Sequence, residues 1–87
     1  MEQLLLESTE TQTETTSKLV LHNDEVNTFD FVIESLIEIC HHSWEQAEQC
    51  SLFIHHKGKH NVKSAALKQL RPLKEAFLER GINATIE

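Results

Sequence analysis

The residues best suited to chemistry lie in a short polar run, Asn23-Asp24-Glu25, which follows an apolar segment at residues 19–21 and precedes a helical pattern that begins near Phe29. A single Asn or Asp is enough to form a turn by hydrogen bonding to its own backbone. An amide followed by two carboxylates, with no base between them, therefore indicates that a positively charged group is expected at this junction.

His55 would complete such a site if a later helix ran beside the first one. The Asn23 oxygen, the Asp24 carboxylate and a neutral His55 nitrogen would then converge as three acceptors. A primary ammonium has three donors and no acceptor, so it matches this set. Apolar side chains about one helical turn away could form a pocket wall: Phe29, Val32 and Ile54. Such a site would suit the first residue of a polypeptide. From the residues alone, two turn residues and a core histidine remain the alternative.

Metal binding is a second interpretation, because the chain has six histidines: His22, His41, His42, His55, His56 and His60. Imidazole is a good ligand for Zn, Cu or Ni. Adjacent histidines point to different helix faces, however. Only His56 and His60 have the i, i+4 spacing, and Gly58 lies between them. A metal site is therefore a minor alternative.

Catalysis is not expected. The sequence shows no recognisable Ser-His-Asp spacing and no phosphate-binding glycine loop, and it has two glycines in all. The net charge of −6 argues against nucleic acid as the main partner. Lys18 is the only Lys or Arg before residue 57, whereas seven lie between Lys57 and Arg80, which suggests two differently charged faces. We expect neither an enzyme nor a cofactor.

The composition predicts a single domain without a membrane segment. The longest apolar runs are far shorter than the ~20 residues that span a bilayer, and the N-terminus lacks the basic start of a secretory signal. We therefore expect a cytoplasmic protein. Cys40 and Cys50 fall on predicted buried helix faces, and we expect both to be reduced thiols.

The hydrophobic pattern predicts an α+β domain at residues 18–87, after a disordered acidic extension at residues 1–17 with four glutamates and no base. The element order is β-α-α-β-α-β. The predicted strands lie at residues 18–22, 61–63 and 82–87, and the predicted helices lie at residues 28–41, between Ser43 and Gly58, and from Ser64 to Arg80.

Local signals mark the ends of these helices. Asp30 and Gln46, three residues after the first two predicted caps, are placed to form capping boxes. The third helix should kink or restart at Pro72. Arg80 and Gly81 should close it. The predicted N-caps, in chain order, are Asn27, Ser43 and Ser64.

A strand followed by Asn-Asp-Glu, then Asn-Thr and a helix with Phe-Val near its start, resembles the ClpS adaptor family of bacterial Clp proteases. Residues 54–59 (Ile-His-His-Lys-Gly-Lys) and the final Thr-Ile-Glu also resemble that family. The resemblance covers residues 18–87. It implies a small three-stranded antiparallel sheet packed against helices, similar to the C-terminal domain of ribosomal protein L7/L12.

The resemblance implies a monomeric, non-enzymatic adaptor of the N-end rule. Such an adaptor binds the free α-amino group and a large hydrophobic first residue (Phe, Leu, Tyr or Trp) of a substrate. It then delivers the substrate to the N-terminal domain of a AAA+ Clp unfoldase, with the help of a mobile N-terminal extension. By position, Asn23, Asp24 and His55 would hold the amine, and Arg71 would belong to the unfoldase-docking surface. The side-chain pocket would be formed by Phe29, Val32, Ser51, Ile54 and Ile82, with Asn27 at its mouth.

Three positions depart from the family pattern. Phe29 and Ser51 stand where the family commonly has Met, and Ala66 stands where an acidic residue is usual. These departures concern the pocket shape and the docking surface. A docking module of the same fold with a vestigial pocket is therefore the runner-up hypothesis, followed by a small His-rich metal-binding protein.

Overall fold

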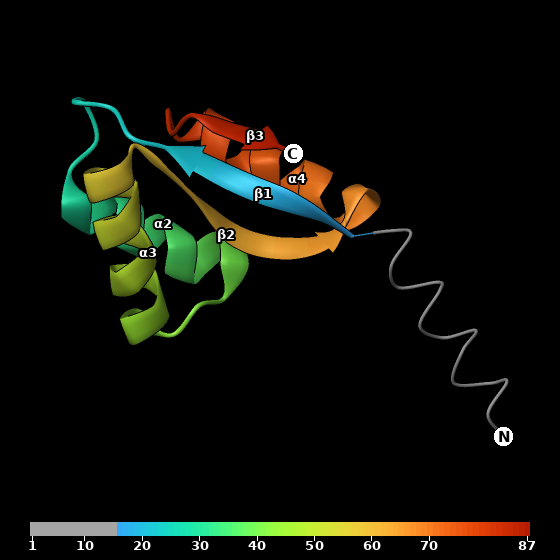
Figure 1. Cartoon of the computed structure of the whole chain (residues 1–87), viewed down its shortest axis with the longest axis horizontal. Helices are drawn as coiled ribbons and strands as arrows, with labels where there is room; N and C mark the ends of the chain where they lie inside the picture. The colour runs from blue at the N-terminus through green and yellow to red at the C-terminus, as the bar shows by residue number, and fades with distance from the viewer. Residues whose placement is uncertain (1–15) are drawn as a thin grey trace, which may run out of the picture.

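The predicted element order is found in the computed structural model, which describes residues 16–87. The strands form an antiparallel sheet in the order β2-β1-β3. Figure 1 shows α4 behind this sheet, and α2 and α3 beside one another near the end of β1. The predicted α+β class with a three-stranded antiparallel sheet is confirmed. The elements are β1 (Thr16–His22), α2 (Phe29–Cys40), α3 (Trp44–Lys57), β2 (Lys59–Ala66), α4 (Leu67–Glu79) and β3 (Ala84–Ile86).

One hydrophobic core joins the sheet to all three helices. Successive side chains of a strand point to opposite faces, so Leu19 and Leu21 share one face of β1. Both are fully buried, and Val62 of β2 and Ala84 of β3 belong to the same core. The helices therefore cover a single face of the sheet. They contribute Ile33, Leu36 and Cys40 from α2, Ala47 and Ile54 from α3, and Leu70 and Phe77 from α4.

The N-cap of α2 is Thr28, so the prediction of an Asn27 cap with Asp30 reaching back was wrong. The Thr28 hydroxyl accepts a hydrogen bond of 3.0 Å from the backbone N–H three residues later. Asn and Thr are both good caps by residue type. The choice is made by the tertiary structure, because the Asn27 amide is held by Asp24 and by the carbonyl of Gly81.

Helix α3 begins and ends as its sequence predicts. The Ser43 hydroxyl accepts from the backbone N–H of Gln46, and the Gln46 side chain accepts from the backbone N–H of Ser43, each at 3.1 Å. This is the predicted capping box. Gly58 ends the helix with a φ of 91°, and its N–H donates to the carbonyl of Ile54 at 2.9 Å.

Strand β2 is longer than the predicted 61–63, and Ser64 lies within it. The prediction that Ser64 caps the third helix was therefore wrong. The cap position of α4 belongs to Ala66, which makes no side-chain capping bond. The physical reason is the pairing with β1, which runs from Thr16–Ala66 to His22–Lys59. Backbone hydrogen bonds between strands do not require an apolar sequence pattern, so the sequence did not indicate the full length of β2.

The two outer strand limits also differ from the predictions. Strand β1 begins at Thr16, so the last two residues of the predicted extension at 1–17 belong to the sheet. The rest of that prediction lies outside the described residues. Strand β3 occupies the middle of the predicted 82–87 segment. The first residue of β1 pairs with Ala66 of β2, whereas β3 is limited to the three residues that pair with β1.

Pro72 lies inside α4, and the predicted restart is absent, because the helix continues from Leu67 to Glu79. Leu70 and Phe77, on either side of Pro72, are both fully buried. Their packing against the sheet outweighs the one backbone hydrogen bond that a proline cannot make. Gly81 follows the helix with a φ of 80° and donates to the carbonyl of Leu78, as a C-terminal glycine is expected to do.

Both cysteines are free thiols, as predicted. Cys40 is buried in the core, and burial raises its pKa to about 11. The pKa of the partly buried Cys50 is also raised, because burial disfavours its thiolate. Both groups therefore stay protonated at neutral pH and pack as small apolar side chains.

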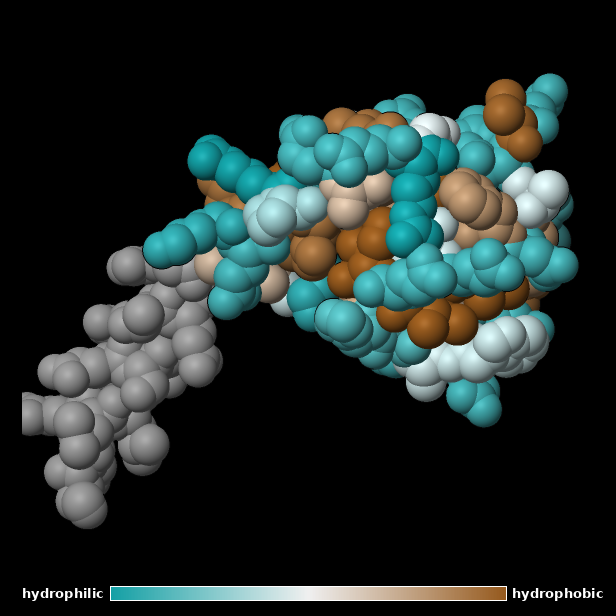
Figure 2. All heavy atoms as spheres, turned by 180° about the vertical axis from the view of Figure 1, so that it is seen from behind, coloured by the Kyte–Doolittle hydropathy of each residue, from teal (hydrophilic) through white to brown (hydrophobic). Residues whose placement is uncertain are grey.

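Apolar side chains also remain on the surface, where they lie among hydrophilic ones (Figure 2). Among residues 16–87, no helix combines the length and apolar character needed to cross a bilayer. The large apolar residues with the most exposure are Val26, Trp44, Leu78, Leu67 and Phe29.

The end of α3 yields a stability prediction. A Cβ at Gly58 would meet no atom within 4 Å. The cost of Gly58→Ala therefore comes only from placing alanine in a left-handed backbone conformation. We expect this variant to lose about 1–2 kcal/mol of unfolding free energy. Gly58→Asn should lose less, because Asn adopts this conformation more readily. Urea denaturation of the wild type and the two variants measures this order of stabilities. An Ala variant as stable as the wild type would contradict the assigned backbone geometry.

Candidate functional site

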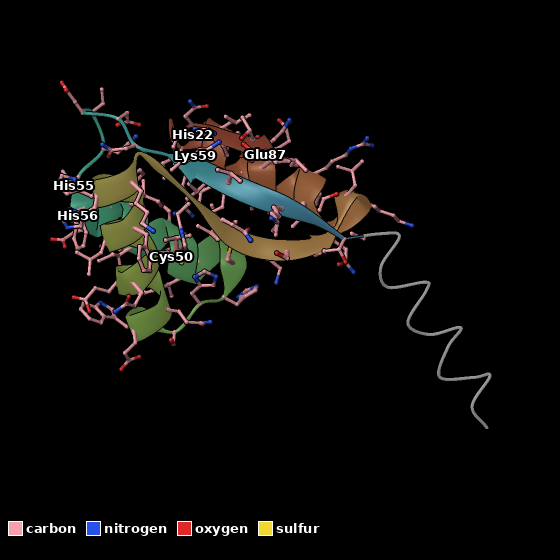
Figure 3. All side chains as sticks on the ribbon, viewed as in Figure 1. His22, Cys50, His55, His56, Lys59 and Glu87 are labelled. Carbon is pink, nitrogen blue, oxygen red and sulfur yellow. The ribbon has the colours of Figure 1, made fainter. Side chains whose placement is uncertain are left out.

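A cavity of about 570 Å³ lies where the loop after β1 meets the first turn of α2 and the last turns of α3. It combines the polar run with apolar residues from both helices. Figure 3 shows His55 at the end of α3, beside the loop between β1 and α2. The lining residues are Asn23, Asp24, Glu25, Asn27, Phe29, Val32, Ser51, Ile54 and His55.

A small void of about 20 Å³ adjoins this cavity and shares Val32 and Ile54 with it. Ile82, between α4 and β3, lines this void. The structure thus brings together all the residues that the sequence analysis assigned to the amine and side-chain sites. Arg71 is separate from them. It is exposed on α4 and lines neither space.

A backbone hydrogen bond joins the two halves of the site. The N–H of Asn23 donates to the carbonyl of Gly58 at 2.8 Å, immediately beyond the His22–Lys59 pair of the sheet. Since α3 ends at Gly58, its last turn, which carries His55, lies next to the start of the β1–α2 loop. The sheet register therefore places an imidazole beside Asn23 and Asp24, although more than thirty residues separate them in the chain.

The Asp24 carboxylate organises the loop around it. One oxygen accepts from the backbone N–H groups of Val26 and Asn27, each at 2.9 Å. The other accepts from the Asn27 side-chain amide at 2.9 Å. The hydrogen bond from the Asn27 backbone N–H is the main cause of the lowered pKa of Asp24. Burial opposes this effect, and the hydrogen bonds from the Asn27 side chain and the Val26 backbone lower the pKa further. The carboxylate is therefore charged at neutral pH and fixed at the mouth of the cavity.

Asn27 links this loop to the far end of the chain. Its side-chain nitrogen donates both to Asp24 and to the carbonyl of Gly81, each at 2.9 Å. Ile82 follows Gly81 directly and is almost fully buried. The bond from Asn27 thus fixes the α4–β3 connection against the cavity. Sequence reasoning placed Asn27 at the mouth but did not foresee this bridge.

Apart from the loop residues and His55, the lining of the cavity is apolar with one exception. Val32 is half-buried, Ile54 is 5% exposed, and Phe29, at 39% exposure, stands near the opening. The exception is Ser51, which is 3% exposed, and its hydroxyl has no hydrogen-bond partner within the described part of the chain. Glu25 also lines the cavity. It was not among the predicted site residues, although the polar run contained the signal for it.

The histidines form no metal centre within residues 16–87, where no three His, Cys, Asp or Glu side chains could hold an ion together. Several have other contacts. The His22 ring forms a hydrogen bond of 2.8 Å with the Thr85 hydroxyl. The His42 ring forms one of 3.0 Å with the Val62 carbonyl. The His60 ring stacks on Phe53, with ring centroids 4.7 Å apart.

Comparisons with known proteins give a consistent result. A family model described as the ATP-dependent Clp protease adaptor protein ClpS matches residues 12–82. A ClpS adapter protein of Campylobacter jejuni strain 81-176 is 54% identical over 41 residues, which cover 47% of this chain and 43% of that protein. A ClpS adapter of Acetivibrio thermocellus is 43% identical over 42 residues, covering 48% of this chain and 42% of that protein. Each match spans less than half the length of these relatives.

A solved structure supports the same fold. Agrobacterium tumefaciens ClpS2, bound to L-phenylalaninamide, superimposes with a TM-score of 0.77 at 23% identity, over 84% of this chain and 95% of that one. The fold and the cavity define a small α+β domain with an apolar cavity that is bordered by polar residues. Since the family model matches most of the sequence, the chain belongs to the ClpS family of Clp protease adaptor proteins.

The lowered pKa of Asp24 predicts how stability depends on pH. The pKa of the Asp24 carboxyl is lower in the folded chain than in the unfolded chain, where it is near 3.8. Such a group stabilises the fold at pH values above its pKa in the unfolded chain. This contribution is lost as the pH falls through the pKa of the folded state. We expect Asp24→Asn to be less stable than the wild type by about 0.5–1.5 kcal/mol at pH 7. The difference should shrink in strong acid.

Urea denaturation from pH 7 to pH 2 measures this effect. Glu34→Gln is a matched control, because it removes an exposed carboxylate from α2 that does not line the cavity. It should not reproduce the pH-dependent loss seen with Asp24→Asn. A constant difference between wild type and Asp24→Asn across this range would show that the Asp24 charge does not stabilise the loop.

Proposed function

We propose that this protein binds polypeptides through a free α-amino group and a large hydrophobic first residue, and delivers them to a AAA+ Clp unfoldase. The observation that carries the proposal is the position of the fixed Asp24 carboxylate. It lies at the edge of an apolar cavity that Asn23 and His55 also border.

Three acceptors are available for the ammonium group. Asp24 has two oxygens with several lone pairs and uses only part of this capacity within the loop. The side chain of Asn23 is exposed and has no hydrogen-bond partner among residues 16–87. His55 is exposed in the last turn of α3 and accepts through a ring nitrogen when it is neutral. A primary ammonium would satisfy all three.

The cavity suits the side chain of the first residue. Its volume lies within the range of roughly 300–1,000 Å³ that is usual for small-ligand sites. Val32, Ile54 and Ile82 would contact an apolar side chain, and Phe29 at the opening would disfavour one branched at Cβ. The L-phenylalaninamide bound to the Agrobacterium protein combines an α-amino group with a phenyl ring. We expect Phe, Leu, Tyr and Trp to be accepted as first residues.

Delivery to the unfoldase would use a different surface. Arg71 is exposed on α4 and separate from the cavity, so a partner could contact it while a substrate is bound. We propose that Arg71 meets an acidic region of the unfoldase N-terminal domain. We further propose that the segment before β1 assists the transfer. This role makes the protein an adaptor that binds without catalysing a reaction.

The first functional prediction concerns the amine. A peptide with an N-terminal Phe should bind, and its N-acetylated form should not, because acetylation removes the positive charge and two donors. Asp24→Ala should weaken binding of the free peptide at least ~10-fold, since a charge-assisted contact contributes about 1.5–3 kcal/mol. Fluorescence anisotropy measures both effects. Glu34→Ala, outside the cavity, should bind as the wild type does. Equal affinity for the acetylated peptide would refute the proposal.

The second functional prediction concerns the docking surface. Arg71→Glu should abolish co-migration with a Clp unfoldase N-terminal domain in size-exclusion chromatography, because it places a like charge against an acidic partner. Peptide binding should be unchanged. Lys18→Glu makes the same charge change at an exposed position of β1 and should bind the unfoldase normally. If both variants bound the unfoldase equally well, Arg71 would have no part in docking.

A further inference from the structure

The side-chain amide of Asn27 is fully engaged within the fold. Its nitrogen donates to one oxygen of the Asp24 carboxylate and to the backbone carbonyl of Gly81, each at 2.9 Å. Both partners are acceptors without a hydrogen to give, so they require the nitrogen of the amide, and not its oxygen, on their side. An amide nitrogen carries two hydrogens. Asn27 therefore lines the cavity with no N–H left to offer a ligand.

The bond from Asn27 holds the one oxygen of Asp24 that the loop backbone does not hold. The other oxygen accepts from the backbone N–H groups of Val26 and Asn27, each at 2.9 Å. A carboxyl group turns easily about its bond to Cβ, because this torsion has no narrow energy wells. With both oxygens engaged, that rotation is blocked. The direction of the Asp24 carboxylate is thus set by the Asn27 side chain together with the backbone.

The Gly81 carbonyl gives the Asn27 amide a fixed anchor. The N–H of Gly81 donates to the carbonyl of Leu78 at the end of α4, at 2.9 Å. The preceding residue, Arg80, donates from its guanidinium to the hydroxyl of Ser35 on α2, at 3.1 Å. Two helices therefore hold the turn that carries this carbonyl. Through Asn27, they also determine where the carboxylate of the loop after β1 lies.

A role for Asn27 as a simple wall of the side-chain pocket explains less. A wall residue needs a suitable shape only, and Val32 and Ile54 provide it without a polar group. The two hydrogen bonds of Asn27 have a different effect. They connect a charged group on one side to the turn beside Ile82 on the other.

We propose that Asn27 is a positioning residue for amine recognition, which holds the Asp24 carboxylate in the direction that meets the ammonium group of a bound polypeptide. This inference rests on the proposed function, in which Asp24 binds the amine. It assigns Asn27 to the amine site, whereas the family resemblance placed it at the mouth of the side-chain pocket. The benefit is preorganisation, because a carboxylate that is already ordered loses little entropy when the ligand binds.

A double-mutant cycle tests this role with a fluorescent peptide that begins with a free Phe. Asn27→Ala should weaken binding about 3–10-fold, as expected when a side chain must be ordered on binding. In a chain that already carries Asp24→Ala, the same substitution should change the affinity less than about twofold, because no carboxylate is left to position. Effects that multiply in the double variant would show that Asn27 acts on the ligand by itself, which would overturn the proposal.

The pKa of Asp24 gives a readout that needs no ligand. The backbone N–H of Asn27 is the main cause of its lowered value, burial opposes this effect, and the Asn27 side chain lowers the pKa further. Asn27→Ala removes only the side-chain bond, so the pKa of Asp24 should rise. NMR titration of the carboxyl carbon measures this change, and an unchanged pKa would contradict the positioning role. Asn27→Ser, with one hydroxyl hydrogen for two acceptors, should give an intermediate pKa and affinity.

Asn61→Ala is the matched control. The Asn61 amide also donates within the fold, to Ser64 at 3.0 Å, but it lies in β2 and lines neither the cavity nor the adjoining void. This variant should bind the Phe peptide as the wild type does and keep the pKa of Asp24. In Asn27→Ala, peptides that begin with Phe and with Leu should lose affinity by the same factor, because they share the amine. A changed ratio between them would return Asn27 to the side-chain pocket and overturn the proposal.

The outcomes separate this inference from the proposed function. Equal binding of the free Phe peptide by the wild type and by Asn27→Ala would overturn the role of Asn27 while leaving the adaptor function intact. Failure of that peptide to bind the wild type, or equal binding of its N-acetylated form, would refute the proposed function itself and this inference with it.

Discussion

The site depends on the hydrogen bond between the Asn23 N–H and the Gly58 carbonyl. This bond extends the β1–β2 pairing by one step beyond the strands. Because α3 ends at Gly58, the bond also fixes the last turn of that helix against the loop after β1. The proposed amine acceptors therefore keep their relative positions through backbone geometry. Gly58 suits this position because the helix must turn through a left-handed conformation before β2 begins.

Asp24 holds the loop through its hydrogen bonds, and in the proposed function it also recognises the amine. Its hydrogen bonds to the Val26 and Asn27 backbones hold the loop, and they also keep the carboxylate ionised by lowering its pKa. The negative charge is therefore present before any ligand arrives, and little ordering is needed on binding. Such preorganisation reduces the entropic cost of association. A polar network that holds a charge beside an apolar cavity is the physical basis of the proposed amine recognition.

Local signals predicted much of the fold because they act over a few residues. The Ser43–Gln46 capping box and the glycine at position 58 were correct, since both depend on neighbouring backbone groups alone. The cap at Asn27 and the cap at Ser64 were wrong, because distant contacts decide them. Asn27 is held by the Gly81 carbonyl, and Ser64 is drawn into a strand by its pairing with β1. The intrinsic preference of a residue for a helix cap does not include contacts with distant parts of the chain.

The sequence by itself determined the element order and the family, and it indicated which residues would form the site. The sequence shows polar residues after a strand and a histidine shortly before a helix-ending glycine. Their chemical types can be identified without a structure. Only the tertiary structure decided that these residues share one cavity, since the β1–β2 register brings Asn23 to Gly58. It alone also showed that the Ser51 hydroxyl is buried without a partner. Burial and hydrogen-bond satisfaction depend on all surrounding elements, so no local pattern specifies them.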